Sequence, residues 1–306
     1  MIGVVAWVGA GAIGQQIWRA AWVVPLAVGI HATQLGLSAL AWRIVTGASK
    51  PAFTTWWLVR WVREAVNSML PVAQLGGNLV GIRLLAHAGV PLAQGGAGVT
   101  LDLTMEAASL AAFSLAGVGV LASIGVGHAW VPWLAAGAAL LGLGVAGLLL
   151  AGRLGLLRLA EAGFDRLARL LPGGKTGGLS GLHSEFVRLS QHRAALWRTG
   201  LLHLLAWVIG CGETWLALAA MGQAPSWQAV LVIESLGMAA RNAGFMVPGA
   251  LGVQEGGFVL VSGLFGIPAD TAIALSMVKR ARELAVGVPG LLAWQWSELR
   301  RPGTPA

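Results

Sequence analysis

The chain has 306 residues, of which 57% are hydrophobic and only 10% are charged, and its mean hydropathy is +0.75. A soluble domain carries about 25% charged residues, so this composition excludes a soluble fold. Apolar runs of about 20 residues, the length that crosses a bilayer, recur along the chain, and they lack the alternation of β-barrel strands. We therefore expect an all-α, polytopic integral membrane protein.

The expected elements follow the apolar runs in chain order. Membrane helices are expected at about 1–15, 21–45, 56–86 (broken near Pro71), 100–125, 131–151, 196–221, 227–266 (broken near Pro248) and 270–296. We expect them to form a single membrane domain over 1–306. Tryptophans lie near the ends of these runs, where an interfacial aromatic belt is expected.

The basic residues indicate orientation rather than nucleic-acid binding, which we do not expect. Eight of the 20 Lys and Arg lie between Arg153 and Arg198, in the longest polar region. By the positive-inside rule this loop, 153–195, is cytoplasmic. Its first part, 153–172, has an apolar and a charged face, which is typical of a helix lying on the membrane surface. Both termini are then expected on the cytoplasmic side of the membrane, which the family resemblance given below implies to be a bacterial inner membrane.

Two segments rich in glycine and proline, 70–91 and 241–257, resemble each other. A shift of 177 residues superimposes Pro71 on Pro248 and Glu106 on Glu283, and it gives seven identities over the 38 positions of 71–108. A three-residue insertion also brings Gly76 and Gly77 onto Gly256 and Gly257.

These segments predict two repeat units, 56–125 and 227–296, of inverted topology, each with a broken, re-entrant helix. Proline removes a backbone donor and glycine tolerates unusual backbone angles, so both open a helix. Interrupted helices in inverted repeats indicate a transporter's central binding site. The alternative is that small residues merely allow close helix packing.

Charged residues accompany both breaks. Arg60, Arg63, Glu64, Asn67 and Pro71 share one helical face by their spacing. Each charge costs about 2.5 to 3.5 kcal/mol at the centre of a membrane helix, so such a stripe must face the bundle interior. The candidate substrate pathway comprises Arg60, Arg63, Glu64, Asn67, Pro71, Gly76, Gly77, Glu234, Arg241, Pro248, Gly249, Gly252, Glu255, Gly256, Gly257, Lys279, Arg280, Arg282 and Glu283.

The alternative for these charges is local neutralisation. It would pair Arg60 with Glu64, Lys279 with Glu283, and Glu234 with Arg241 as structural ion pairs, and Arg241 with Glu255 across the break. Lys279, Arg280, Arg282 and Glu283 are instead expected opposite Asp102 and Glu106.

Other polar residues carry weaker signals. Glu213 is interpreted either as a proton-coupling carboxylate or as a residue near the outer interface. His31 and His203, in apolar helices, are expected to be hydrogen-bonded packing residues. Cys211 is expected to pack in the core.

The sequence does not favour an enzyme. Glu255 and Glu234 could act as a general acid and base, but the chain has no nucleophile beside a base and no metal-binding motif. We expect no catalytic residue, no metal and no cofactor.

The motifs LPVAQLGGNLVGIRLL, ESLGMAARNAGFMVPGALGVQEGG and VKRARELAVGVPGLLAW resemble the flippase-like superfamily related to the transmembrane region of lysylphosphatidylglycerol synthases. The form VPGALGVQEGG is most similar to its hopanoid-associated HpnL branch. The resemblance implies a membrane protein that handles a lipid, and it implies that Arg241, Glu255, Arg280 and Glu283 belong to its core motif. The synthases' soluble aminoacyl-transferring domain has no counterpart here, so lysyl transfer is not expected.

We therefore expect a lipid transporter whose substrate is a hopanoid or an anionic lipid. A non-transporting accessory subunit, bound to lipid-synthesis proteins, is the alternative. An intramembrane transferase that uses Glu255 as a base is a weaker third interpretation.

Overall fold

The computed structural model describes residues 10–70, 75–127, 129–159, 161–162, 180–244, 247 and 250–299. Every regular element in these ranges is a helix, which confirms the all-α prediction. The helices are α2 (Ala10–Ala20), α3 (Val23–Thr46), α4 (Phe53–Met69), α5 (Gly76–His87), α6 (Leu92–Ser123), α7 (Val131–Leu154), α9 (Leu182–Ser190), α10 (Arg193–Ala220), α11 (Trp227–Ala243), α12 (Val253–Gly263) and α13 (Ala269–Leu299).

Among these helices, α3, α6, α7 and α10 are long and apolar enough to cross a membrane. The other long helix, α13, has 31 residues and would be about 46 Å long at 1.5 Å per residue. It carries Lys279, Arg280 and Arg282, which lower its hydropathy. The molecule is a polytopic helical membrane protein, as the composition predicts.

Local sequence sets where the helices begin and end. Gly47 ends α3 with φ +66, and its N–H donates to the carbonyls of Arg43 and Ile44, which is the backbone conformation that glycine tolerates best. Ser226 begins α11, because its hydroxyl oxygen accepts the N–H of Ala229.

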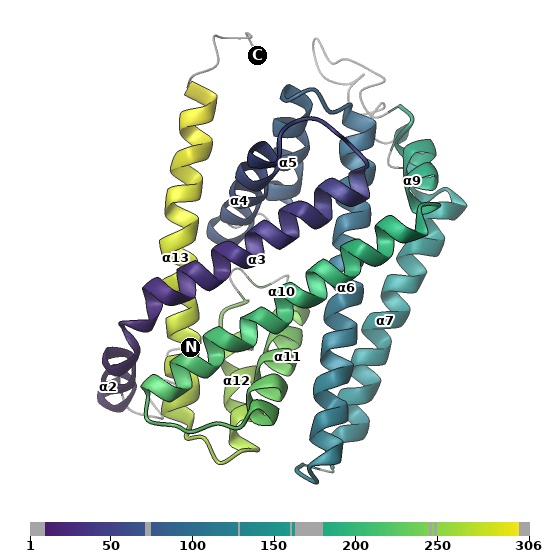
Figure 1. The fold of residues 1–306 in the computed structure, drawn as a ribbon. Helices are drawn as coiled ribbons and strands as arrows, with labels where there is room; N and C mark the ends of the chain where they lie inside the picture. Colours follow the sequence, from purple (N-terminus) through teal and green to yellow (C-terminus); the bar gives the residue numbers. More distant parts are fainter. Residues whose placement is uncertain are drawn as a thin grey trace.

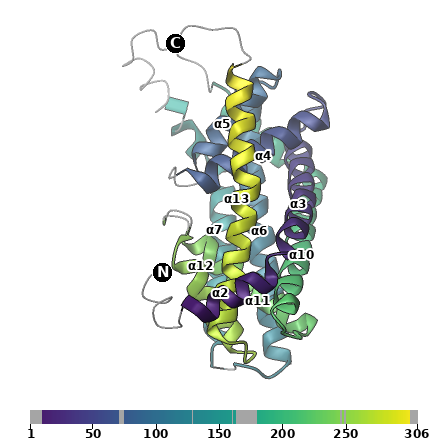
Figure 2. The same cartoon turned by 90° about the vertical axis from the view of Figure 1, so that its left-hand side faces the viewer.

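Two three-helix units run in opposite directions through the molecule. The first contains α4, α5 and α6, with 17, 12 and 32 residues; the second contains α11, α12 and α13, with 17, 11 and 31 residues. Figures 1 and 2 show α5 near one end of the molecule and α12 near the other. Helices α6 and α13 run in opposite directions (Figure 1). The division into two inverted repeat units, 56–125 and 227–296, stays a prediction.

The apolar core is divided between the two ends. One hydrophobic cluster joins the end of α3 to α4, α5, α9 and the start of α6, and includes Trp42 and Trp56. A second joins the ends of α6 and α10 to α11, α12 and the start of α13, and includes Phe258 and Leu218. A smaller apolar cluster of Phe113, Cys211 and Val230 joins α6, α10 and α11.

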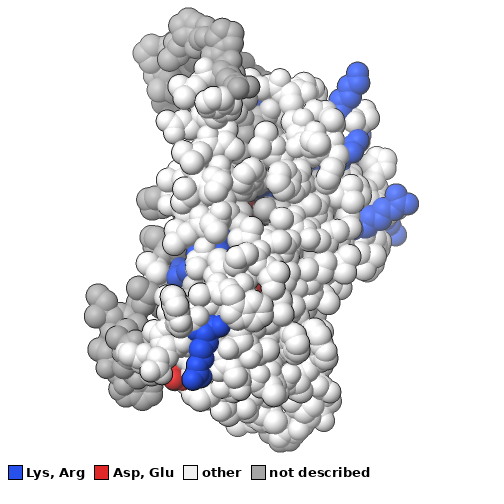
Figure 3. Space-filling view, turned by 60° about the vertical axis from the view of Figure 1, so that its left-hand side comes forward, with Lys and Arg blue, Asp and Glu red and all other residues white. Residues whose placement is uncertain are grey.

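The outer surface is largely apolar. Most of the face in Figure 3 carries neither basic nor acidic side chains. Helix α7 exposes Leu140 and Leu143, which are 67% and 68% accessible. Such a surface suits lipid rather than water. The connections after α3 and around α9 and the end of α13 lie at the same end of the molecule (Figure 1), so the basic loops gather on one side.

Some predictions concern residues that are not described or need correction. Pro71, Pro248, Gly249 and 163–172 lie outside the described residues. The surface helix expected at 153–172 does not begin at Arg153, because α7 continues to Leu154 and ends at Gly155, whose φ is +110. Helix α9, within the loop, was not expected.

Candidate functional site

A polar cavity of about 410 Å³ lies between the two apolar clusters. Helices α3, α4, α6, α7, α10, α11 and α13 all contribute to its wall. Charged side chains of the lining come from α4, α6, α10, α11 and α13, and apolar ones include Leu103 and Leu110 of α6 and Leu141 of α7. The cavity therefore has both charged and apolar side chains in its lining.

One charged cluster connects α4 to α6 and α10. Nη1 of Arg60 lies 3.1 Å from Oδ2 of Asp102, and Nη1 of Arg63 lies 2.7 Å from the same oxygen. Arg60 also donates to Glu106 at 3.0 Å. Nε2 of His203 lies 2.9 Å from the other Asp102 oxygen. All oxygens of the fully buried Asp102 are thus held by cationic or N–H groups.

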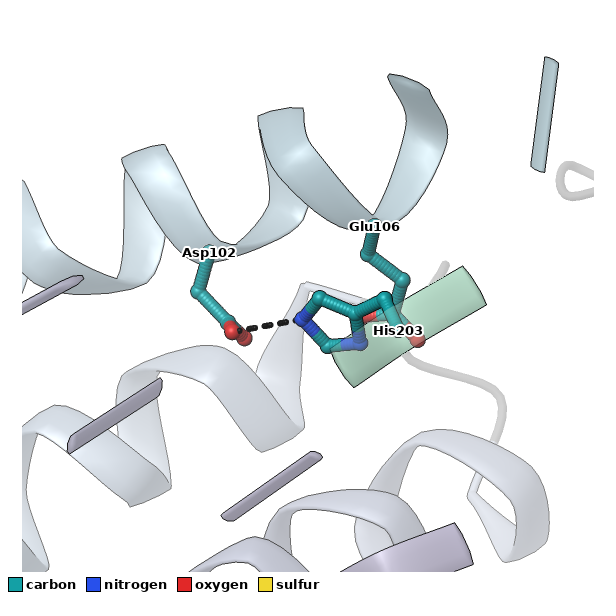
Figure 4. Close-up of side chains that lie close together, drawn as sticks. All are labelled: Asp102, Glu106 and His203. Carbon is teal, nitrogen blue, oxygen red and sulfur yellow. Dashed lines mark hydrogen bonds and ion pairs between the residues drawn. The ribbon is translucent and has the colours of Figure 1, made fainter. Parts of the chain in front are cut away.

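Asp102, Glu106 and His203 also bring their ligand atoms within 4.8 Å of one another (Figure 4). Carboxylates and imidazole can bind a metal ion. Here the guanidinium groups of Arg60 and Arg63 already neutralise both carboxylates, and they would repel a second cation. The residues therefore fit an arginine-neutralised cluster and not a cation site.

A second cluster connects α13 to α10 and α11. Nζ of Lys279 lies 2.9 Å from Oε2 of Glu234 and 3.9 Å from Oε2 of Glu213. The hydroxyl of Thr214 donates to Glu234 at 2.5 Å. Lys279, Glu213 and Glu234 are nearly inaccessible, so this part of the site is a buried, paired structure.

The second cluster extends to the end of α11. Arg241 donates to Glu283 and, at 2.5 Å, to Oε1 of Gln254 at the start of α12. Arg282 lies 3.5 Å from Glu213 and 3.6 Å from Glu283. Arg241 therefore links the α11–α12 hairpin to α13 through side chains that line the cavity.

His31 of α3 lies between the two clusters. Its Nε2 lies 2.5 Å from Oε1 of Glu64, and its Nδ1 lies 2.6 Å from Nη1 of Arg282 and 3.1 Å from Oε1 of Gln34. Nε2 of Gln34 donates to the carbonyl of Ala206 at 2.7 Å, which directs its Oε1 toward the histidine. The network thus spans α3, α4, α10 and α13.

The charges in this network do not balance. Its acids in the described residues are Glu64, Asp102, Glu106, Glu213, Glu234 and Glu283. Its bases, apart from the two histidines, are Arg60, Arg63, Arg241, Lys279 and Arg282. Acids exceed these bases by one, so a single further positive charge would neutralise the network.

Only some of these side chains reach the open space of the cavity. The side chains of Glu64, Glu106 and Arg241 are 33%, 26% and 20% accessible, whereas those of Arg63 and Asp102 are 3% and 0%. The accessible groups can meet a ligand, and the inaccessible groups hold them in place.

The structure brings about half of the predicted pathway into one cavity. Its lining includes Arg60, Arg63, Glu64, Asn67, Glu234, Arg241, Lys279, Arg282 and Glu283. Outside the lining are Gly76, Gly77, Gly252, Glu255, Gly256, Gly257 and Arg280, while Pro71, Pro248 and Gly249 are not described.

Residues of the first group outside the lining shape the α4–α5 hairpin. The N–H of Gly77 donates to Oδ1 of Asn67 at 2.8 Å. A Cβ atom at Gly77 would lie 2.1 Å from the carbonyl oxygen of Arg63. Only glycine permits this approach, and it places α5 directly against the turn of α4 that carries the cavity arginine.

The α11–α12 hairpin is held by a charge instead. Oε2 of Glu255 accepts the N–H of Gly252 at 2.7 Å, which caps the start of α12, and Oε1 accepts from Nε of Arg280 at 2.7 Å. Glu255 is 2% accessible. It therefore positions α12 against α13 and does not face the cavity.

The ion pairs expected from sequence spacing are wrong. Arg60 binds Asp102 and Glu106 rather than Glu64, and Lys279 binds Glu234 rather than Glu283. Side chains on one helix face point inward together, so in this packed bundle the opposite charges come from neighbouring helices.

Two further expectations about pairing are also wrong. Arg241 binds Glu283, not Glu234 or Glu255. Asp102 and Glu106 face α4, not the charged segment of α13, because α13 places Lys279 against α10 and α11.

Several site residues were undervalued by sequence reasoning. His31 and His203 belong to the charged network, beyond a packing role, and Glu213 is 1% accessible, so it does not lie at an interface. Gln34 was not considered. The available signal was a histidine and a glutamine three residues apart in an otherwise apolar helix, each costly to insert. Cys211 is buried, as expected.

A family model described as the lysylphosphatidylglycerol synthase TM region matches residues 1–290. The match covers nearly all of the described helices. No curated protein and no solved structure matches the chain.

Proposed function

Because this chain belongs to the lysylphosphatidylglycerol synthase TM region family, we propose that it moves a lipid headgroup across the bacterial inner membrane through the charged cavity. The lipid tails remain in the bilayer during this movement. The protein acts as a transporter of flippase type and not as an enzyme.

The observation that carries this proposal is a cavity lined by ten of the eleven network charges, inside a bundle with an apolar outer face. Each such charge costs about 2.5 to 3.5 kcal/mol to place in a membrane helix. If these charges served only to hold the helices together, ion pairs fully enclosed by protein would be sufficient. Here Glu64, Glu106 and Arg241 keep a quarter or so of their side chains open to the cavity.

These accessible groups suit a polar headgroup. The guanidinium of Arg241 can hold a phosphate or paired hydroxyl oxygens through parallel N–H bonds. Glu64 and Glu106 accept hydrogen bonds from hydroxyl or amine groups. Leu103, Leu110 and Leu141, on the α6–α7 side of the cavity, supply the apolar surface beside which a hydrocarbon tail can lie.

The finer substrate assignment is a hopanoid or a related lipid. It rests on the resemblance of VPGALGVQEGG, residues 247–257, to the hopanoid-associated branch. A hydroxyl-rich headgroup and an anionic headgroup both suit an arginine beside carboxylates, so both belong in the test.

The experiment is a flip assay in proteoliposomes with two fluorescent lipids, one anionic and one neutral and hydroxyl-rich. We expect the wild type to exceed protein-free vesicles for at least one lipid, and Arg241→Gln to slow that lipid at least about tenfold, the loss of one charged contact of about 1.4 kcal/mol. Arg241→Lys should retain part of the rate.

The matched control is Arg188→Gln, at an exposed pair with Glu185 on α9, which should leave the rate unchanged. Wild-type rates equal to those of protein-free vesicles would contradict the proposal. Unchanged flip rates in Arg241→Gln would show that the lipid headgroup does not cross through the charged cavity.

A further inference from the structure

The two partners of Nδ1 of His31 require opposite protonation states. Arg282 has only N–H donors, so its contact at 2.6 Å needs an unprotonated Nδ1. Oε1 of Gln34, at 3.1 Å, is an acceptor and needs a protonated Nδ1. Because Gln34 donates its amide N–H to Ala206, its oxygen stays on the histidine side. Protonation of Nδ1 therefore determines whether it forms its hydrogen bond with Gln34 or with Arg282.

The excess of one negative charge in the network also indicates His31 as the proton-binding residue. The six acids exceed the five arginine and lysine bases by one, so one proton would neutralise the network. Glu64 has His31 as its ion-pair partner within 4 Å among the described residues. A neutral His31 leaves Glu64 without a full positive charge, and a protonated His31 supplies it.

His203 is the other histidine of the network, but it is enclosed. Its side chain is 2% accessible, and its partner Asp102 already binds Arg60 and Arg63. The His31 and Glu64 side chains are 12% and 33% accessible, so a proton can reach them from the cavity. His31 is therefore the network histidine that a proton in the cavity can reach.

The groups around His31 come from every helix that packs on α3. Glu64 and Arg282 contact it from α4 and α13. Arg60 from α4, Glu213 from α10 and Glu106 from α6 line the same cavity. Helix α2, which precedes α3, contributes none of the lining residues.

We propose that the His31–Glu64 pair binds one exchangeable proton and that this proton is the coupling ion for lipid movement, a role that rests on the proposed function. The proton enters from water in the cavity, binds at Nδ1 of His31, and later leaves to the opposite side. One proton crosses for each headgroup, and no covalent bond changes.

Proton binding changes the contacts of Arg282. A protonated Nδ1 donates to Gln34 and releases Arg282 toward Glu213 and Glu283, which lie at 3.5 and 3.6 Å, just beyond hydrogen-bond distance. Glu283 also binds Arg241. Strengthening one contact of Glu283 weakens the other, so a proton on His31 frees Arg241 to hold the headgroup.

The test uses full-length protein in vesicles of phosphatidylethanolamine and phosphatidylglycerol, with the membrane potential clamped at zero and a fluorescent anionic lipid as the probe. At one proton per lipid, a gradient of one pH unit drives about a tenfold ratio of probe between the leaflets. We expect this ratio for the wild type and for His192→Gln, whose histidine is exposed. We expect a ratio near one for His31→Gln and Glu64→Gln, with flipping without a gradient retained in His31→Gln.

Nitrogen NMR of the imidazoles in nanodiscs provides a second readout that needs no transport. Measured from about pH 5 to 8, the range in which an unperturbed histidine changes charge, the signals lost in His31→Gln should show both the neutral and the charged form, and Glu64→Gln should change their proportion. A His31 that stays neutral over this range overturns the proton site. If the wild type flips the probe but the leaflet ratio does not respond to the pH gradient, coupling to the proton is overturned and the proposed function is kept. If the wild type does not flip the probe at all, both the proposed function and the coupling are overturned.

Discussion

At the scale of single residues, the site depends on charges that are buried together. Asp102 is fully inaccessible and forms ion pairs with both Arg60 and Arg63. Burying charges is costly, but removing one partner from such a group costs more, because the others remain buried without compensation. The inaccessible members of the network therefore set the stability of the bundle, while the accessible members meet the ligand.

Asp102→Asn should destabilise the protein by about 3 to 5 kcal/mol, because two buried guanidinium groups lose their shared carboxylate. The measurement is equilibrium unfolding in mixed micelles. Glu185→Gln, which breaks an exposed pair on α9, should cost less than about 1 kcal/mol. Equal effects of the two substitutions would show that the buried cluster does not stabilise the fold.

The sequence alone predicted the site residues that share one helix face. The stripe of Arg60, Arg63 and Glu64 follows from helical spacing, which depends only on neighbouring turns. Their partners could not be assigned, since His31, Asp102 and Glu106 lie on helices remote in the chain and become neighbours only by packing.

At the scale of elements, the two hairpins are built by different means. The α4–α5 hairpin depends on the close approach of Gly77 to α4 and on the amide of Asn67. The α11–α12 hairpin depends on Glu255, which caps α12 and binds Arg280. The helix lengths and breaks could be predicted from prolines and glycines, but these contacts could not.

Gly77→Ala should prevent α5 from seating, because its Cβ would lie 2.1 Å from the Arg63 carbonyl and 2.6 Å from Asn67 Oδ1. We expect a marked loss of monodisperse protein in size-exclusion chromatography. Gly256→Ala is the control, since its Cβ meets no atom within 4 Å and alanine favours a helix by about 0.5 to 1 kcal/mol. Normal behaviour of both variants would argue against close packing at Gly77.

Glu255→Ala should loosen the start of α12, because the Gly252 N–H and the Arg280 guanidinium both lose their acceptor. Hydrogen exchange of the peptides covering 247–257 should become faster, while exchange in α5 stays unchanged. Equal exchange in the variant and the wild type would mean that the cap does not hold this hairpin.

At the scale of the whole molecule, a polar layer formed by the charged cavity lies between the two large apolar clusters, and the inverted orientation of the two predicted repeat units stays a prediction. Composition and apolar run length predicted the helical membrane fold. They could not predict that the polar layer would be an open cavity, because that depends on how seven helices pack around it.

Opposite orientation of the two units can be checked with single cysteines in a Cys211→Ala background. A cysteine at Ala88, between α5 and α6, should react with a membrane-impermeant maleimide from the side that carries the basic loops. A cysteine at Ala269, at the start of α13, should react only from the other side. Labelling of both from one side would exclude the inverted arrangement.

The central claim is that a lipid headgroup occupies the charged cavity. The direct measurement is photocrosslinking with a lipid that carries a diazirine in its headgroup, followed by mass spectrometry of the labelled peptides. Headgroup occupancy predicts labels on cavity residues such as Ser68, Trp207 and Met238. Labels confined to outward-facing residues such as Leu140 and Leu143 of α7 would contradict it.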